Sequence, residues 1–273
     1  MIDVVKSALS AVRRGGTVSI VGVYGTTYDN FPLGQAFDKG VRIAMGQATV
    51  HKYIDDLIRL VVDGQVRTTD VTDLNLITAM LAVPREEFVP AERRALAYID
   101  EDLLIAPAQG GHPARFLMEA SPLAKLLQLA EITASDIVLD VGCGTGYSAA
   151  LLSRLASSVI ALESDSFLVA QANEKLAALG CDNVAVVQGE LNRGYASEAP
   201  YEVIFLGGSV ESVPQALFDQ LKEGGRLVAV EGHGNAAVAK LYLKSGGQVT
   251  ARRAFNAAIK PLPGFESASA FQF

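Results

Sequence analysis

Two acidic residues stand at the ends of neighbouring apolar runs, where a ligand can reach them. Asp140 lies two residues before Gly142 in the stretch VLDVGCGTGYSAALLS (residues 138–153), and Glu163 lies at the end of the next apolar run, SVIALES. The first stretch predicts a strand, a turn with glycine at alternate positions and the start of a helix. A carboxylate at the end of a strand can accept hydrogen bonds from both hydroxyl groups of a ribose. The pattern therefore predicts a nucleoside site at the ends of two adjacent strands.

The glycine spacing argues against a dinucleotide site. A dinucleotide-binding turn carries G-x-G-x-x-G, so that the main chain and a helix N-terminus approach a pyrophosphate. Here glycines occupy positions 142, 144 and 146, and Tyr147 stands where the third glycine is needed. The sequence around Asp140 contains no lysine or arginine to meet a phosphate. We therefore expect a ligand that carries a cation and an amine rather than a polyanion.

The residues from Ser135 onward predict the elements that position this site. Apolar runs alternate there with amphipathic stretches such as residues 167–179 and 213–221. Near-continuous apolar strands separated by helices indicate a mostly parallel, doubly wound α/β sheet that is covered on both faces. Ligands of such sheets bind beyond the carboxyl ends of the strands, where the strand order reverses. The predicted strands are IVLDV, SVIALES, NVAVVQ, EVIFLGG, RLVAVEG and KLYLKS.

Two further regions precede this sheet. Residues 69–81 and 122–130 have helical periodicity, and residues 106–115, APAQGGHPAR, predict a loop that is either a lid over the ligand or a surface connection. The first sixty residues predict a small α/β appendage with two strands, GGTVSIVGVYG and VRIAMGQ, and one amphipathic helix, HKYIDDLIRLVVDG. So few elements bury no independent core, so the appendage needs to pack on the rest of the chain or on a second copy.

Charge and composition narrow the range of functions. The net charge is −7 and there is no block of lysine and arginine, so we expect no nucleic-acid partner. No apolar run approaches the roughly 20 residues that a membrane span needs, and the N-terminus lacks a secretory pattern. The two cysteines, Cys143 and Cys181, have no metal-ligand spacing. We expect a cytoplasmic protein without a metal site or a membrane contact.

The order strand, Asp140, G-x-G-x-G, helix, strand, Glu163 resembles the Rossmann-like methyltransferases that use S-adenosyl-L-methionine (SAM). The resemblance implies that SAM is the cofactor, that Asp140 orients its amine and that Glu163 binds its ribose. It also implies that Glu190, in VVQGEL, lies beside the adenine. Cys143 then supplies a small side chain inside the turn rather than a nucleophile. The other cofactor-binding positions that the resemblance implies are Gly142, Gly144, Thr145, Gly146, Ser164, Gly189 and Gly207.

Residues from about position 62 onward are similar to protein-L-isoaspartate O-methyltransferases. The similarity rests on AMLAVPREEFVP, LAYIDEDLLI, the cofactor run, GYASEAPYEVIFLGGSVESVPQALFDQLKEGGRLVAVEG and KPLPGF. The VPRE-x-FVP segment is the more specific part, because the whole superfamily shares the cofactor motifs. The resemblance implies a carboxyl O-methyltransferase for isoaspartyl residues of damaged proteins. Residues 62–134 would form its helical part and lid, and residues 135–273 its SAM-binding domain.

One position departs from this family's pattern. Its members carry a Thr-Ile-Ser-x-Pro segment, whose serine lies near the transferred methyl group. Here LMEASP puts Ala120 in place of the serine and Met118 in place of the threonine, with Ser121 as the neighbouring hydroxyl. The resemblance places the substrate side at residues 106–118, LGGS and KPLPGF, and makes His112 a candidate contact for the acceptor. Three functions stay open: an isoaspartyl methyltransferase, a methyltransferase for another acceptor, and a SAM-binding or S-adenosylhomocysteine-binding protein with weak or no turnover.

Residues 1–61 resemble the end of the cofactor domain of zinc-containing, medium-chain alcohol dehydrogenases. The resemblance lies in LSAVRRGGTVSIVGVYGTTYDNFPLGQAFDKGVRIAMGQATVHKYIDDLIRLV. The glycine turn, the acidic residue for the NAD ribose and the zinc ligands of that family are missing, so this piece cannot act as a dehydrogenase. In those enzymes the last strand of the domain pairs across a subunit interface, and VRIAMG matches it. We expect this segment either to dock on the methyltransferase or to form a homodimer.

Overall fold

The computed structural model describes residues 17–21, 42–46, 71–99 and 101–266. The chain divides into two compact units, Met1–Arg67 and Thr68–Phe273. In the first unit, β1 (Thr17–Val21) pairs in parallel with β2 (Arg42–Gly46), which confirms the two predicted strands. Parallel strands need a long crossover connection between them. The helix predicted within residues 51–64 lies outside the described residues.

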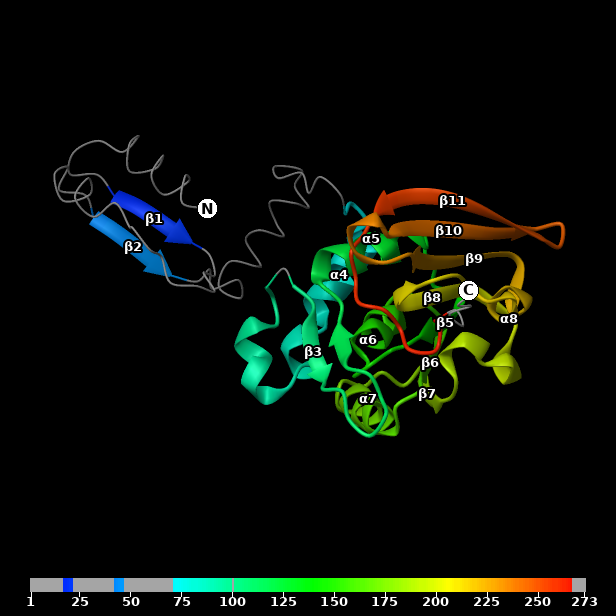
Figure 1. The fold of residues 1–273 in the computed structure, drawn as a ribbon, viewed down its shortest axis with the longest axis horizontal. Coiled ribbons are helices and arrows are strands. Elements are labelled where there is room, and N and C mark those ends of the chain that lie inside the picture. Colours follow the sequence, from blue (N-terminus) through cyan, green and yellow to red (C-terminus); the bar gives the residue numbers. More distant parts are fainter. Residues whose placement is uncertain (1–16, 22–41, 47–70, 100, 267–273) are drawn as a thin grey trace, which may run out of the picture. The chain divides into compact units, whose positions relative to one another are not determined.

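The second unit is built on a seven-stranded sheet with the order β11-β10-β9-β8-β5-β6-β7 (Figure 1). The five parallel strands are β5 (Ile137–Val141), β6 (Ser158–Glu163), β7 (Val184–Gln188), β8 (Tyr201–Val210) and β9 (Leu221–Glu231). An antiparallel hairpin of β10 (Val238–Ser245) and β11 (Gln248–Asn256) completes one edge. The mostly parallel sheet and all six predicted strands are confirmed. The sequence does not predict β11, because QVTARRAFN is largely exposed and has no apolar run.

Most of the helices that cover this sheet begin and end within a few residues of the predicted helical segments. They are α4 (Leu74–Ala82), α5 (Ala120–Leu129), α6 (Tyr147–Ser153), α7 (Ser166–Ala178) and α8 (Gln215–Asp219). Short 3₁₀ turns are η1 (Arg85–Phe88), η2 (Ala91–Leu96), η3 (Leu191–Arg193), η4 (Ala196–Glu198) and η5 (Gly234–Ala236). None of the helices in the described ranges is long and apolar enough to cross a membrane.

Alternation along the central strands divides the core into two layers. Val138 packs with the cluster that contains α4, α5, α6 and α7, whereas Leu139 belongs to the cluster on the opposite face with α8. Successive side chains of a strand point to opposite faces, so Asp140 shares the α6 face with Val138. On β6 the same alternation puts Glu163 on the face of Ala161, which belongs to the α6-side cluster. Both acids therefore lie on one face, at neighbouring strand ends.

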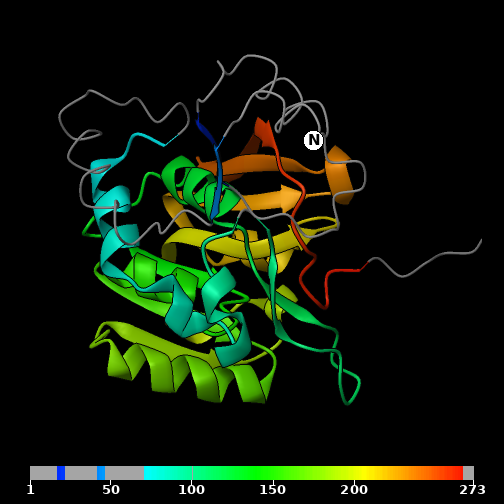
Figure 2. The same cartoon turned by 90° about the vertical axis from the view of Figure 1, so that its left-hand side faces the viewer.

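A small antiparallel hairpin stands next to these strand ends. It consists of β3 (Leu103–Ala106) and β4 (Arg115–Leu117), and its connection carries a bridge between Gln109 and His112. The segment predicted as a loop is therefore the tip of a hairpin, which extends away from the sheet in Figure 2. The strand order reverses between β5 and β8, since β6 and β7 lie on one side of β5 and β8 on the other.

Candidate active site

The glycine turn joins β5 to α6 and has a backbone that only glycine adopts readily. Gly142, Gly144 and Gly146 have φ angles of +82°, +58° and +98°, in the left-handed region. A Cβ at Gly142 would lie 2.5 Å from Leu262 Cδ2, and a Cβ at Gly207 on β8 would lie 2.9 Å from the Gly142 carbonyl oxygen. The turn therefore presents main chain without side chains of its own, and Leu262 and Ile105 pack on it, at the point where the strand order reverses and where ligands of such sheets bind.

Asp140 lies below this turn and is fully buried, at 0% exposure. Its Oδ2 accepts a hydrogen bond of 2.6 Å from Ser148 Oγ, whereas its Oδ1 has no partner among the described residues. Burial is the main reason that the pKa of the Asp140 carboxyl rises to about 7; the Ser148 hydrogen bond opposes this rise and the charge of Glu163 adds to it. A buried acceptor without a donor is costly. Oδ1 is therefore suited to a donor that a ligand brings, such as an amine.

Glu163 is also fully buried and is paired with a cation that the sequence does not reveal. Arg115, from β4, donates from Nη1 to Oε1 of Glu163 and from Nη2 to Oε2, the latter at 2.8 Å. Its Nη2 lies 3.5 Å from the Gly142 carbonyl oxygen. The expectation that no lysine or arginine adjoins this site is therefore wrong. Arg115 lies 48 residues from Glu163 in sequence, and only the β3–β4 hairpin brings the two together.

The VPREEFVP segment supports the glycine turn from below. Thr145 Oγ1 donates to the Phe88 carbonyl oxygen at 2.6 Å, and the rings of Phe88 and Tyr147 are 5.4 Å apart. Arg85 donates from Nε to the Ala97 carbonyl oxygen and from Nη2 to the Met118 carbonyl oxygen, at 2.7 and 2.6 Å. Its guanidinium carbon lies 4.9 Å from the centre of the Tyr147 ring. The family-type segment is thus a buried support for the turn and for the end of β4.

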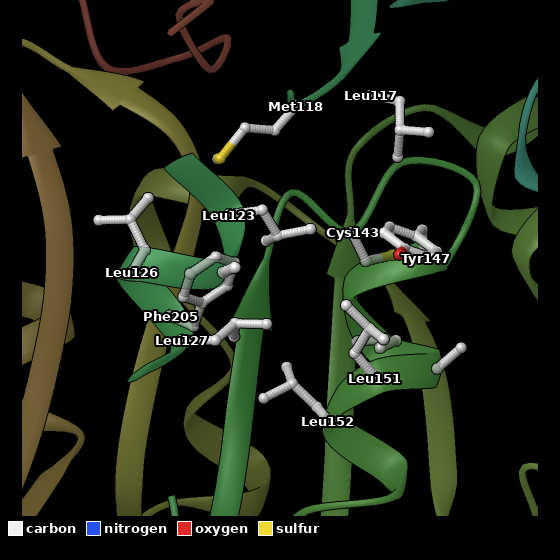
Figure 3. Close-up of a cluster of buried hydrophobic side chains, with 14 of the residues drawn as sticks. Leu117, Met118, Leu123, Leu126, Leu127, Cys143, Tyr147, Leu151, Leu152 and Phe205 are labelled. Carbon is white, nitrogen blue, oxygen red and sulfur yellow. The ribbon is translucent and has the colours of Figure 1, made fainter. Parts of the chain in front are cut away.

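A small, mostly apolar cavity of about 20 Å³, room for about one water molecule, adjoins the turn. Its lining comes from the β3–β4 hairpin, α5, the turn with the start of α6, and β8. Figure 3 shows the buried cluster around it: the leucines of α5 face those of α6, with Leu117 and Met118 above them. The lining residues are Ile105, Phe116, Leu117, Met118, Leu123, Gly142, Cys143, Gly144, Tyr147, Ser148, Phe205 and Gly207. Such a mostly apolar lining suits a methyl group and its displacement.

The C-terminal KPLPGF segment lies against the LGGS end of β8. Ser209 N donates to the Lys260 carbonyl oxygen at 3.0 Å, and Leu262 N donates to the Ser209 carbonyl oxygen at 2.9 Å. Lys260 Nζ lies 5.3 Å from the centre of the Phe116 ring on β4. Three segments expected on the substrate side, the hairpin, LGGS and KPLPGF, therefore meet at the edge of the cavity.

The structure gathers most of the predicted cofactor positions around the glycine turn. Asp140, Cys143, Thr145 and Gly207 lie at this point together with the turn glycines and Glu163. Burial raises the pKa of the Cys143 thiol, in agreement with a small packing residue rather than a nucleophile. Ser164 N and Gly144 N both donate to Glu163, at 2.8 and 2.9 Å.

Other predicted residues lie apart from the cavity. His112 and Ser121 are exposed, and neither lines the cavity beside the turn. His112 instead lines a groove with Asp165 and other residues. Ala120 begins α5 and is half-buried. Gly189 and Glu190 follow β7, where Glu190 is exposed and paired with Arg193. Within the described ranges, no three His, Cys, Asp or Glu side chains gather closely enough to hold a metal ion.

Asp140 and the glycine turn fit a sulfonium nucleoside that carries an amine, whereas Glu163 can bind its ribose only after a rearrangement. The unpartnered Oδ1 of Asp140 and the glycine main chain match an amine-bearing ligand that lies against main chain, once Leu262 and Ile105 move off the turn. The carboxylate of Glu163 is occupied by Arg115 in this structure, so its oxygens can accept ribose hydroxyls only after the arginine moves.

Comparisons with known proteins agree with this geometry. The family described as Protein-L-isoaspartate(D-aspartate) O-methyltransferase (PCMT) matches residues 58–264. A protein-L-isoaspartate O-methyltransferase of Koribacter versatilis is 36% identical over 203 residues, which cover 74% of this chain and 89% of the relative. One of Helicobacter pylori (strain P12) is 38% identical over 166 residues, which cover 61% of this chain and 77% of the relative.

Solved structures show the same fold. A protein-L-isoaspartate O-methyltransferase superposes with a TM-score of 0.64 and 26% identity, over 77% of this chain and 66% of the other. A Plasmodium falciparum protein described as an enzyme of this kind, in complex with S-adenosyl-L-homocysteine, has a TM-score of 0.59 and 21% identity, over 75% of this chain and 94% of the other. With a family match that spans most of the chain, the protein belongs to the protein-L-isoaspartate(D-aspartate) O-methyltransferase family.

Proposed function

We propose that this protein transfers the methyl group of SAM to the free carboxylate of an isoaspartyl residue in a damaged protein. The observation that carries this proposal is the buried, unpartnered Oδ1 of Asp140 beside the glycine turn, in a chain of this family. An amine of the cofactor supplies the missing donor for Oδ1. The apolar residues around the small cavity beside the turn then surround the methyl group.

Several residues hold the cofactor in this proposal. Asp140 binds the amine, and the main chain of the turn from Gly142 to Gly146 lies against the methionyl part. Glu163 accepts from the ribose, and Ser164 helps to fix the Glu163 carboxylate. Gly189 and Glu190, at the end of the neighbouring strand β7, lie on the adenine side.

When bound, SAM supplies an electrophilic methyl group: the bond from the acceptor oxygen to the methyl carbon forms as the carbon–sulfur bond breaks, leaving a methyl ester and a neutral thioether. The acceptor carboxylate is already ionised, so the chain needs no strong general base. Its residues instead orient the reactants and exclude water, and good orientation alone supplies on the order of 7–11 kcal/mol of barrier reduction. The apolar lining from Phe116, Met118 and Phe205 serves the exclusion of water.

A radiolabel assay tests the proposal. The full chain is incubated with SAM that carries a labelled methyl group and with either an isoaspartyl peptide or the same peptide with normal aspartate. We expect base-labile label on the isoaspartyl peptide alone. Calorimetric titration with S-adenosylhomocysteine (SAH) accompanies the assay. Tight SAH binding without label on either peptide would contradict the proposed acceptor and leave a binding protein or a methyltransferase for another acceptor.

Restoring the family hydroxyl is expected to raise turnover modestly. Ala120 begins α5 directly after β4, so Ala120→Ser returns a hydroxyl to its family position. One neutral hydrogen bond contributes about 0.5–1.5 kcal/mol, which predicts a rise in kcat of up to about tenfold. Ser121→Ala is the matched control, because the exposed Ser121 side chain is expected to contribute nothing. If kcat of Ser121→Ala falls as much as kcat of Ala120→Ser is expected to rise, Ser121 supplies the hydroxyl that the family serine supplies elsewhere.

We also propose that residues 1–61 are a dehydrogenase-like fragment that forms a homodimer. The parallel pairing of β1 and β2 supports a fragment of a Rossmann-type sheet, and a two-stranded sheet is too small to be stable alone. Sedimentation of the full chain is compared with that of a chain that starts at Val61. We expect a dimer for the former and a monomer for the latter; monomer masses for both would remove the dimer.

A further inference from the structure

The ion pair between Arg115 and Glu163 fills the carboxylate that the cofactor needs. Oε1 of Glu163 accepts from Arg115 Nη1, from Ser164 N at 2.8 Å, from Ser164 Oγ at 3.2 Å and from Asp165 N at 3.2 Å. Oε2 accepts from Arg115 Nη2 at 2.8 Å and from Gly144 N at 2.9 Å. A carboxylate offers about four lone-pair positions. Two of these positions belong to each oxygen, so Oε2, with Gly144 N and Arg115 Nη2, has no acceptor capacity left for a ribose while Arg115 stays in place.

The main-chain donors show which partner has to leave. Ser164 N, Asp165 N and Gly144 N belong to the strand end and the glycine turn, so they keep Glu163 in position whether or not the arginine is present. Arg115 reaches Glu163 only through its side chain, from the β3–β4 hairpin. Arg115 is thus the partner that can move away without disturbing the sheet.

A carboxylate acceptor also needs a cation in a site that holds two acids. Arg115 is 5% exposed and is the first residue of β4. Phe116 and Met118, one and three positions later, line the cavity. The other buried arginine of this region, Arg85, is held by two main-chain carbonyl oxygens below the turn. Guanidinium groups bind planar carboxylates through two parallel hydrogen bonds, as Arg115 already does with Glu163.

We propose that Arg115 is the acceptor-binding residue of this site: it rests on Glu163 until the cofactor binds there, and then pairs with the carboxylate of the isoaspartyl acceptor. The inference rests on the proposed function for the identity of the acceptor. It makes binding ordered, with the cofactor first, because Arg115 is released only when the ribose takes its place on Glu163. Before that exchange Arg115 is not free to pair with the acceptor.

The resting contact lowers the apparent affinity for the cofactor. The apparent dissociation constant equals the intrinsic one divided by the fraction of molecules that are competent to bind. If Arg115 occupies Glu163 in nine molecules out of ten, its removal lowers the Kd for SAH about tenfold. Removal of the same side chain deprives the acceptor of its cation. One substitution therefore strengthens cofactor binding and weakens acceptor binding, a combination that a structural role does not produce.

The test uses Arg115→Met, which keeps the length of the side chain and removes its charge. Calorimetry with SAH is expected to give a Kd about tenfold lower than that of the unaltered chain, and the assay with the isoaspartyl peptide a KM at least about tenfold higher, the loss of one charge-assisted pair. Arg94→Met is the matched control, because Arg94 forms an exposed ion pair with Glu87, and both values should stay unchanged there. Lys260→Met removes the other cation near Phe116 and should raise the KM less than Arg115→Met.

Three outcomes would overturn the inference. Weaker SAH binding in Arg115→Met would show that the arginine holds Glu163 in position for the cofactor. An unchanged KM would place the acceptor elsewhere, and an equal rise in Lys260→Met would show a general effect of charge. If the unaltered chain binds SAH but methylates no isoaspartyl peptide, the proposed function fails on its own, and the SAH titration of Arg115→Met still decides whether the arginine competes with the cofactor. Should Arg115→Met not fold, Arg115→Lys, which lacks the two-pronged pairing, is expected to shift both values in the same directions.

Discussion

Asp140→Asn is expected to weaken the binding of SAH by about 10- to 150-fold, because a hydrogen bond to a charged group contributes roughly 1.5–3 kcal/mol. The asparagine side chain keeps the size of the aspartate and can still meet Ser148, but it brings no charge to the cofactor amine. Calorimetric titration of both proteins near pH 8 measures the difference. Equal affinity would mean that the amine binds elsewhere and that the unpartnered Oδ1 has another purpose.

The raised pKa of Asp140 adds a pH dependence to the same measurement. Burial holds the carboxyl partly protonated near neutrality, with a pKa of about 7, and the charged amine binds its ionised form. SAH binding should therefore tighten as the pH rises from about 6 to about 8 and then level off, since a proton has to leave below the pKa. Asp140→Asn has no such proton, so subtraction of its profile isolates Asp140. A flat difference would contradict the assignment.

The raised pKa of Asp140 also predicts how the free energy of unfolding of the cofactor-free protein changes with pH. The folded chain keeps the Asp140 proton up to about pH 7, whereas the unfolded chain loses it near pH 4. Between these values the folded state binds more protons, so the contribution of Asp140 to the free energy of unfolding falls as the pH rises. Urea unfolding at several pH values should show this loss in the unaltered chain, and the difference from Asp140→Asn should become independent of pH below about pH 4.

The strands and the glycine turn can be predicted from sequence because each rests on a local pattern. Apolar runs specify β5 to β9, and the G-x-G-x-G turn with its two acids specifies the ligand position, since parallel strands end at one edge. Arg115 cannot be found in this way. It stands in a short hairpin whose sequence is dense in proline and glycine, and its partner Glu163 comes from another element. A contact between segments so far apart depends on tertiary packing.

Tertiary packing also decides where two other predicted site residues lie. His112 is a candidate contact by residue type, but the hairpin carries it to a groove beside Asp165 rather than to the cavity. Glu190 is exposed and pairs with Arg193, which no periodicity would reveal. The family match begins at residue 58 and the second compact unit at Thr68, and the predicted join near residue 62 lies between them and stays a prediction.

Arg85→Met is expected to lower the free energy of unfolding by about 3 kcal/mol, because two charge-assisted hydrogen bonds of roughly 1.5–3 kcal/mol each are lost and the relief of burying a charge offsets part of this. Burial lowers the pKa of Arg85, which reflects that cost, yet the guanidinium is held by the carbonyl oxygens of Ala97 and Met118. Methionine fills most of the space but leaves both carbonyl groups without this donor.

Urea unfolding measures the effect, and Arg94→Met serves as the control, because an exposed ion pair should contribute less than about 1 kcal/mol. The substitution should also disturb the site. Arg85 stacks on Tyr147 and donates to the Met118 carbonyl oxygen, and both of these residues line the cavity. We expect SAH to protect Arg85→Met from unfolding, with weaker turnover at saturating SAM. A change of less than about 1 kcal/mol would show that the VPREEFVP segment does not act as the support of the turn, and its role would then have to lie in contacts with the acceptor.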